Sequence, residues 1–160
     1  MQAGYVDNFH AGCNDAPGQE IFQHLEGTGE ETLLFCGTGG WITDGNRDTD
    51  WFTAVIGSTG ILHWRLDAEQ ESSGFLLQPQ DCDEVGVAET MEVGPCLEGE
   101  MTIQGQPGDL LWLWVGANDY YPPAGFTGHE YPYVCEFEGI SDGIVATESL
   151  SFDGIKSLYR

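Results

Sequence analysis

The stretch Gly45-Asn46-Arg47-Asp48-Thr49-Asp50-Trp51-Phe52 joins two carboxylates, an arginine and two adjacent aromatic rings, and it leads into the strand-like run Thr53–Ile56. Side chains alternate between the two faces of a strand, so we expect Asp48 and Asp50 to point together and Trp51 to point to the other side. One face would carry negative charge and the other an indole suited to a core. Because like charges this close are costly, the motif needs a partner, either Arg47 with backbone N–H groups or a cation such as calcium.

Short apolar runs recur through the chain at intervals of roughly ten residues, separated by many of its 23 glycines and 7 prolines. This rhythm predicts an all-β domain over residues 1–139, an antiparallel β-sandwich or jelly roll, followed by a C-terminal docking or sorting tail over residues 140–160. The strands we expect are Glu20–His24, Glu31–Cys36, Asp50–Ile56, Gly60–Leu66, Gly74–Leu77, Glu84–Val87, Glu100–Gln104, Asp109–Val115 and Tyr131–Glu138.

The charge of the chain excludes several classes of partner. Its 160 residues include 27 acidic and only 4 basic side chains, for a net charge of -23. Such a surface repels nucleic-acid phosphates and anionic lipids. No apolar run approaches the ~18 residues of a membrane helix, and Met1–Gly4 leads into polar sequence with no visible signal peptide. Acidic surfaces do attract divalent cations.

Five dispersed cysteines in a glycine-rich, lysine-poor chain indicate an oxidising compartment and disulfides. We expect the pairs Cys13–Cys36 and Cys82–Cys96, each closing a short loop and contributing about 3 kcal/mol, although four cysteines allow three connectivities. Because five is odd, at least one thiol is free or paired between chains. We expect Cys135, within an apolar strand, to be a buried free thiol.

Oxygen-bearing side chains at alternate positions predict a calcium site around the opening motif. Calcium in extracellular modules is held by carboxylate, amide and carbonyl oxygens, with a Kd of about 0.1 to 1 mM. The spacing is not that of an EF-hand. Asp7, Asn8, Asn14 and Asp15 near the N-terminus complete the site if the first strand lies beside this one. The ligands we expect are Asp44, Asn46, Asp48, Asp50, Asp7 and Asn8.

Two groups of aromatic residues offer an alternative binding surface. In the proline-stiffened loop Asn118–Pro123, Tyr120 and Tyr121, together with Tyr131, suit a carbohydrate-binding module, although packing onto the sandwich is the more ordinary use of such rings. Trp112 and Trp114 share one face of an apolar strand. We interpret that strand as central and covered on both faces, in preference to a tryptophan platform for sugars.

The sequence predicts no catalytic residues. Gly139–Gly143 matches G-x-S-x-G, but that motif works only at a strand-to-helix elbow in an α/β sheet. The four histidines are scattered, with no HExxH pattern. Acidic pairs are too easily found in so acidic a chain to indicate glycoside hydrolysis.

Four segments, Asp7–Asn14, Phe35–Thr38, Arg47–Phe52 and Trp112–Gly116, together resemble the bacterial pre-peptidase C-terminal domain family over about residues 7 to 138. The resemblance implies a jelly-roll-like sandwich and a non-catalytic accessory role in secreted bacterial proteins. In some members it also implies calcium binding or adhesion to polymers. Family members often carry a further cysteine where this chain has Glu100–Gln104.

We therefore expect a secreted or cell-surface bacterial module that binds or assembles without catalysis. Its partner would be another copy of itself, another extracellular protein or a polymer. Lys156 and Arg160 hold half of the basic charge, so the tail is suited to dock on the acidic body of a neighbouring copy, a contact that builds filaments or homo-oligomers.

Overall fold

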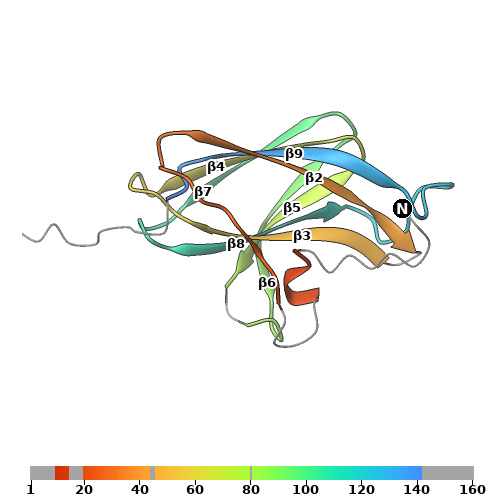
Figure 1. Ribbon diagram of the computed structural model, residues 1–160, viewed down its shortest axis with the longest axis horizontal. Helices are drawn as coiled ribbons and strands as arrows, with labels where there is room; N and C mark the ends of the chain where they lie inside the picture. The colour runs from red at the N-terminus through yellow and green to blue at the C-terminus, as the bar shows by residue number, and fades with distance from the viewer. Residues whose placement is uncertain (1–9, 15–19, 44–45, 80, 142–160) are drawn as a thin grey trace, which may run out of the picture.

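The computed structural model describes residues 10–14, 20–43, 46–79 and 81–141, and over these residues the chain is all-β apart from one short 3-10 turn. Figure 1 shows two layers of strands, with the turn beside one of them. The elements are η1 (Gly12–Asn14), β1 (Gln23–His24), β2 (Thr32–Thr43), β3 (Asn46–Val55), β4 (Ile61–Ala68), β5 (Ser72–Gln78), β6 (Gly86–Val93), β7 (Glu98–Gln104), β8 (Leu110–Ala117) and β9 (Glu130–Glu138).

The strands form one continuous sheet in the order β6-β5-β8-β3-β2-β9-β4-β7, with antiparallel neighbours, and β1 adds parallel to β3. The sheet folds over at β2 and β3, which pair only at their shared hairpin, whereas β3 pairs with β8 over Thr49–Val55. At the far ends, Gly99 of β7 lies against Met91 and Val93 of β6. The result is a nearly closed sandwich, and the all-β prediction is confirmed. Each of the nine expected strands overlaps an observed one, although β6 shares only Gly86 and Val87 with the expected Glu84–Val87.

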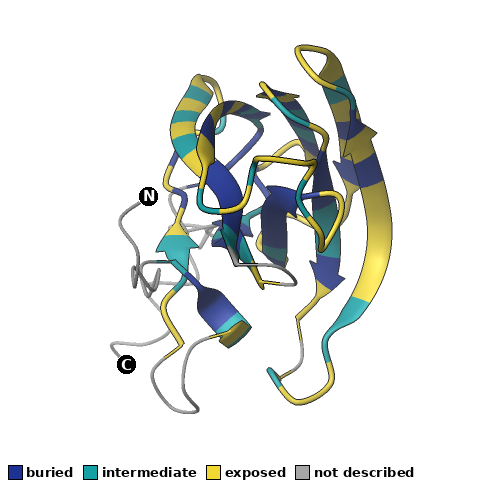
Figure 2. Ribbon diagram, turned by 90° about the vertical axis from the view of Figure 1, so that its right-hand side faces the viewer, coloured by how far each residue is buried: buried dark blue, intermediate teal, exposed yellow. Residues whose placement is uncertain are grey.

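The main core lies between the two layers and is built from alternate residues of each strand. In β9 the alternation is regular, with Tyr131, Tyr133, Cys135 and Phe137 buried and the residues between them more exposed. Figure 2 shows that many buried positions lie in the strands, whereas many of the described loop positions are exposed. β8 is central, as expected, because both of its faces carry packed side chains.

β2 is longer than the sequence indicates because its glycines are not a turn. Gly37 lies directly opposite Tyr133 of β9, and Gly39 lies opposite Tyr131. A Cβ atom on Gly37 would collide with the Tyr133 ring. These cross-strand glycine–tyrosine pairs let large rings lie flat within the core, so the strand continues to Thr43.

The body of the fold extends through residue 141. Ile140 is 2% exposed and forms a bridge with Ile56, and the Ser141 amide donates to the Val55 carbonyl at 2.9 Å. The rest of the expected tail, with Lys156 and Arg160, lies outside the described residues. Within the described part, no helix has the length and apolar character needed to span a membrane.

Candidate functional site: a groove on the outer face of one sheet

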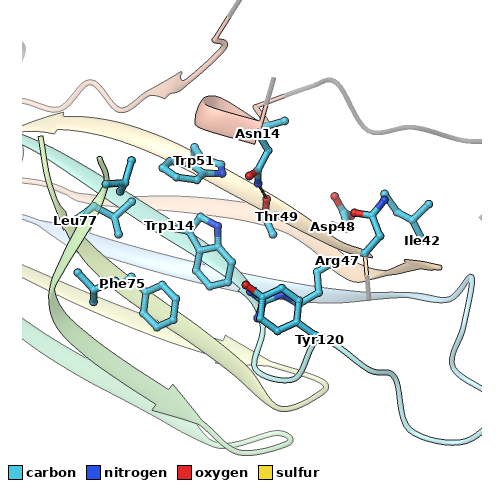
Figure 3. Close-up of a pocket in the computed structure, with 14 residues that line it drawn as sticks. Asn14, Ile42, Arg47, Asp48, Thr49, Trp51, Phe75, Leu77, Trp114 and Tyr120 are labelled. Carbon is cyan, nitrogen blue, oxygen red and sulfur yellow. Dashed lines mark hydrogen bonds between the residues drawn. The ribbon is translucent and has the colours of Figure 1, made fainter. Parts of the chain in front are cut away.

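A groove of about 460 Å³ lies on the outer face of the β6-β5-β8-β3 layer. Figure 3 shows aromatic and apolar side chains at one end and polar ones at the other. Its aromatic residues are Trp51, Phe75, Trp114 and Tyr120; its aliphatic ones include Leu77, Val85 and Val87; and its polar ones include Asn14, Arg47 and Thr49.

Stacked aromatic rings form the floor. Trp114 of β8 and Phe75 of β5 stack with ring centroids 4.6 Å apart and an angle of 9° between the rings. Trp51, Leu77 and Trp114 form a small buried cluster, separate from the main core, which we call the outer cluster. Trp112 shares this face, as expected, but packs on Phe22 with centroids 4.9 Å apart and does not line the groove.

The turn η1 forms one wall, because glycine lets it lie directly on Trp51. Gly12 has φ +51°, and a Cβ there would collide with the Trp51 ring. The Trp51 amide donates to the His10 carbonyl at 2.9 Å, and Asn14 Nδ2 donates to Thr49 Oγ1 at 3.0 Å. Residues 10–14 therefore lie beside β3. The first strand, β1, also pairs with β3, which is the condition on which the calcium prediction depended.

A disulfide joins this wall to the opposite one. Cys13 in η1 bonds to Cys82 in the loop between β5 and β6. The predicted pairs Cys13–Cys36 and Cys82–Cys96 are therefore wrong. The other two cysteines of the predicted pairs lie elsewhere. Cys36 is in β2, opposite Val134 of β9 on the other layer, and Cys96 follows β6. Both are exposed free thiols.

Cys135 is a buried free thiol, as predicted. Burial raises its pKa to about 12. A thiol in that state is a packing group and not a nucleophile at neutral pH.

Arg47 projects from β3 into the polar end of the groove. Its Nη1 donates to the carbonyls of Ala117 at 2.5 Å and Asn118 at 3.1 Å. Its guanidinium lies 3.9 Å from the Tyr120 ring centroid and 5.0 Å from that of Trp114. Arg47 thus fastens the end of β8 and the following loop to β3 through carbonyls and aromatic faces.

Asp48 and Asp50 point together, as predicted, but the two faces are exchanged. Both carboxylates are buried on the inner side of β3, where the Tyr133 hydroxyl donates to Asp50, while Trp51 faces the groove. His10 Nδ1 lies 3.8 Å from Asp50 Oδ1. Burial, followed by the charge of Asp50, raises the pKa of Tyr133 well above its ordinary value.

The described residues supply only part of the expected calcium set. Asp48 and Asp50 are adjacent on one face and Asn46 is exposed at the start of β3. Asp44, Asp7 and Asn8 lie outside the described residues. Among those described, no group of three or more His, Cys, Asp or Glu side chains is arranged to hold a metal. A calcium ion here would need oxygens from the N-terminal segment, and the site stays a prediction.

The three tyrosines of the carbohydrate prediction do not form one surface. Tyr120 and Tyr121 are 60% and 72% exposed, but only Tyr120 lines the groove. Tyr131 is 3% exposed and its hydroxyl hydrogen-bonds Ser72 Oγ at 2.9 Å, so its assignment as a surface ligand residue is wrong. Burial raises its pKa to about 12.

The groove lining that the structure describes contains few titratable groups. Asp48 is the one carboxylate among the lining residues described, and its side chain is buried near Tyr131 and Tyr133. Glycoside hydrolysis needs two carboxylates flanking the bond. The groups with raised pKa, Tyr131, Tyr133 and Cys135, owe it first to burial in the interior and do not line the groove.

Comparisons with solved structures show what the fold is similar to. The pre-peptidase C-terminal domain of a collagenase from Bacillus anthracis matches with a TM-score of 0.51 and 15% identity, covering 78% of this chain and 100% of that one. The Aeromonas hydrophila periplasmic inhibitor of g-type lysozyme, PliG, has a TM-score of 0.47 and 10% identity over 73% of this chain and 94% of its own. The Yersinia pseudotuberculosis-derived mitogen has a TM-score of 0.40 and 14% identity over 74% and 92%.

A scan of the sequence against family models finds no match, and a search of curated proteins finds none either. The resemblance inferred from the sequence is therefore supported through structure. The chain has a β-module fold like that of the pre-peptidase C-terminal domain.

Proposed function

We propose that this chain is a non-catalytic accessory module of a secreted or cell-surface bacterial protein, and that it binds an extracellular polymer or protein through the groove. One observation carries the proposal: the groove is a concave surface with a stacked aromatic floor and polar groups at one end. Sites of this composition hold ligands by apolar contact and a few placed hydrogen bonds.

Two further features support an extracellular setting. The Cys13–Cys82 disulfide closes the groove wall, and such bonds persist in oxidising compartments. The likeness to a domain of a bacterial collagenase is at the level of fold and agrees with an accessory role.

Retention on insoluble matrices tests the proposal. Val87 lines the groove and is 52% exposed, so Val87→Arg would fill the groove without disturbing the core. Val134→Arg is the matched control, because Val134 is an exposed strand residue on the other layer. We expect wild type and the control to be retained on cell-wall polysaccharide, chitin, cellulose or gelatin, and the groove variant to be released. No retention of wild type on any of the four, or equal retention of both variants, would overturn the proposal.

We also propose that a calcium ion stabilises the N-terminal side of the module. Asp50 lies beside His10, and Asp7 and Asn8 precede His10 by three and two residues, a span of at most about 10 Å. The expected N-terminal ligands are therefore within reach of Asp48 and Asp50. A calcium-dependent rise in melting temperature, lost in Asp48→Asn, is the expected result. An unchanged melt would contradict the proposal.

Self-association through residues 142–160 is a separate proposal that rests on charge. Two of the four basic residues fall there, while the whole chain carries -23. Sedimentation of the full chain should show a species larger than the monomer that disappears on deletion of residues 142–160. A monomeric full chain, or assembly that survives the deletion, would refute it.

A further inference from the structure

We propose that the groove takes an uncharged sugar unit of an extracellular polysaccharide, held on the outer cluster and hydrogen-bonded by the Trp51 indole. This inference rests on the proposed binding function and adds the chemical class of the ligand. It also moves the carbohydrate contact from the paired loop tyrosines to a site on the sheet face.

The Trp51 indole N–H points to a ligand. Trp51 is 6% exposed, and among the described residues its Nε1 has no hydrogen-bond partner. Its ring nitrogen is turned toward the side of the groove that holds Asn14 and Thr49 (Figure 3). A buried donor without an acceptor is costly, and an indole N–H can only donate. The Nε1 atom itself has almost no accessible surface, so a ligand oxygen reaches it only after the side chains over it shift, and that contact would then remove the cost.

The neighbouring polar groups suit hydroxyls. Asn14 Nδ2 donates a hydrogen bond to Thr49 Oγ1, and the side-chain amide oxygen of Asn14 remains as an acceptor. Trp51 and Arg47 present donors on either side of that pair. A sugar hydroxyl both donates and accepts, so adjacent hydroxyls of one ring can meet donors and acceptors that alternate along a groove. A purely accepting ligand would use the donors and leave the Asn14 oxygen unmatched.

The charges favour a neutral ligand. Arg47 is the one basic residue that lines the groove among those described, and its guanidinium already serves two carbonyls and the Tyr120 ring. The other N–H groups of Arg47 can still donate, but this single cation stands against a chain charge of -23, which repels a carboxylate or sulfate. An acidic polysaccharide is disfavoured for that reason.

The shape of the groove favours a sugar over an extended peptide. Peptides that bind sheets usually pair with an edge strand through the main chain. Here the polar groups are side chains on a sheet face, and they border apolar surface from Trp114, Phe75 and Val87. One face of a pyranose ring carries C–H groups that pack on such surface. The volume of about 460 Å³ falls within the ~300–1,000 Å³ usual for ligand sites.

Titration with neutral tetrasaccharides of glucose, mannose and N-acetylglucosamine, followed by calorimetry, tests the inference. We expect at least one to bind to wild type, and tetragalacturonate to bind more weakly than that one. Trp51→Phe replaces the indole by a smaller aromatic ring without the N–H, and should weaken binding about fivefold to tenfold, the effect of one hydrogen bond. Tyr120→Ala should weaken binding several-fold, and Tyr121→Ala, its exposed neighbour outside the groove, should leave the affinity unchanged.

Each outcome separates this inference from the proposed function. If Val87→Arg abolishes retention on a matrix but no tetrasaccharide binds or competes, the sugar assignment is overturned and the binding module stands. A capped neutral peptide that competes where sugars do not has the same meaning. Equal losses in Tyr120→Ala and Tyr121→Ala would assign binding to the loop and overturn the groove. Should Trp51→Phe prove unstable, the Tyr120/Tyr121 pair and Val87→Arg keep the test decisive.

Discussion

Replacing both halves of the disulfide should cost a large part of the stability of the fold. Cys13 and Cys82 are 69 residues apart, and the entropy of closing a loop of that length corresponds to about 4 kcal/mol. We therefore expect the double variant Cys13→Ser/Cys82→Ser to lose about 4 kcal/mol in urea unfolding, equivalent to a fall of roughly 10 °C in melting temperature. Both serines leave the other three thiols unchanged.

The control is the reciprocal pair. Cys36 and Cys96 are exposed and free, so Cys36→Ser/Cys96→Ser should change the free energy of unfolding by no more than about 0.5 kcal/mol. The pairing that short-loop closure predicts, Cys13–Cys36 with Cys82–Cys96, would lose both bonds in this variant, at a cost of about 6 kcal/mol. We expect three free thiols in the native wild type. A large loss of stability in the control, or a single free thiol in the wild type, would refute the reasoning.

The remaining predictions concern the core, the pH response and the ion. Gly37→Ala should destabilise by about 1 to 3 kcal/mol because its Cβ would meet the Tyr133 ring, and Tyr133→Phe, which keeps the ring, should not rescue it in urea unfolding. Burial raises the pKa of Cys135 and Tyr131 to about 12 from 9.0 and 10.0. The unfolded chain thus releases these protons first as the pH rises, and stability should be complete below about pH 9 and fall by about 1.4 kcal/mol per pH unit for each group up to about pH 12. Unfolding curves at several pH values that show no such fall would contradict this. Calcium at about 10 to 100 times its Kd should add about 1.4 to 2.7 kcal/mol to the free energy of unfolding, and EDTA should remove it; a gain that persists in Asp50→Asn would place the ion elsewhere.

The sequence was sufficient for the strands because their signal is local. The alternation of Tyr131, Tyr133, Cys135 and Phe137 is visible without a structure, and so is the parity of Asp48 and Asp50. The place of the β2 glycines in a strand is not visible in the sequence. Gly37 belongs to a strand because it pairs with Tyr133, which is 96 positions later. A pattern confined to one segment cannot reveal that a partner strand fills the space of a missing side chain.

The site was harder to predict because it is assembled from distant segments. Trp114 was considered as a platform, but its neighbours Phe75 and Val87 come from strands that adjoin it only in the sheet order β6-β5-β8. The disulfide has the same character, since Cys82 reaches Cys13 across that layer. The motif alone also could not show which face of β3 turns toward the core. Burying an aspartate costs little only when a group such as the Tyr133 hydroxyl donates a hydrogen bond to it.

The most direct test of the binding groove is an NMR titration of the tryptophan indole N–H resonances with the tetrasaccharide that binds best. The account predicts a large shift of the Trp51 indole resonance that saturates with the binding curve. The Trp41 indole donates to the Asp119 carbonyl at 2.9 Å and should keep its position, which makes it the internal control. Saturable binding that leaves the Trp51 resonance unmoved would contradict the account.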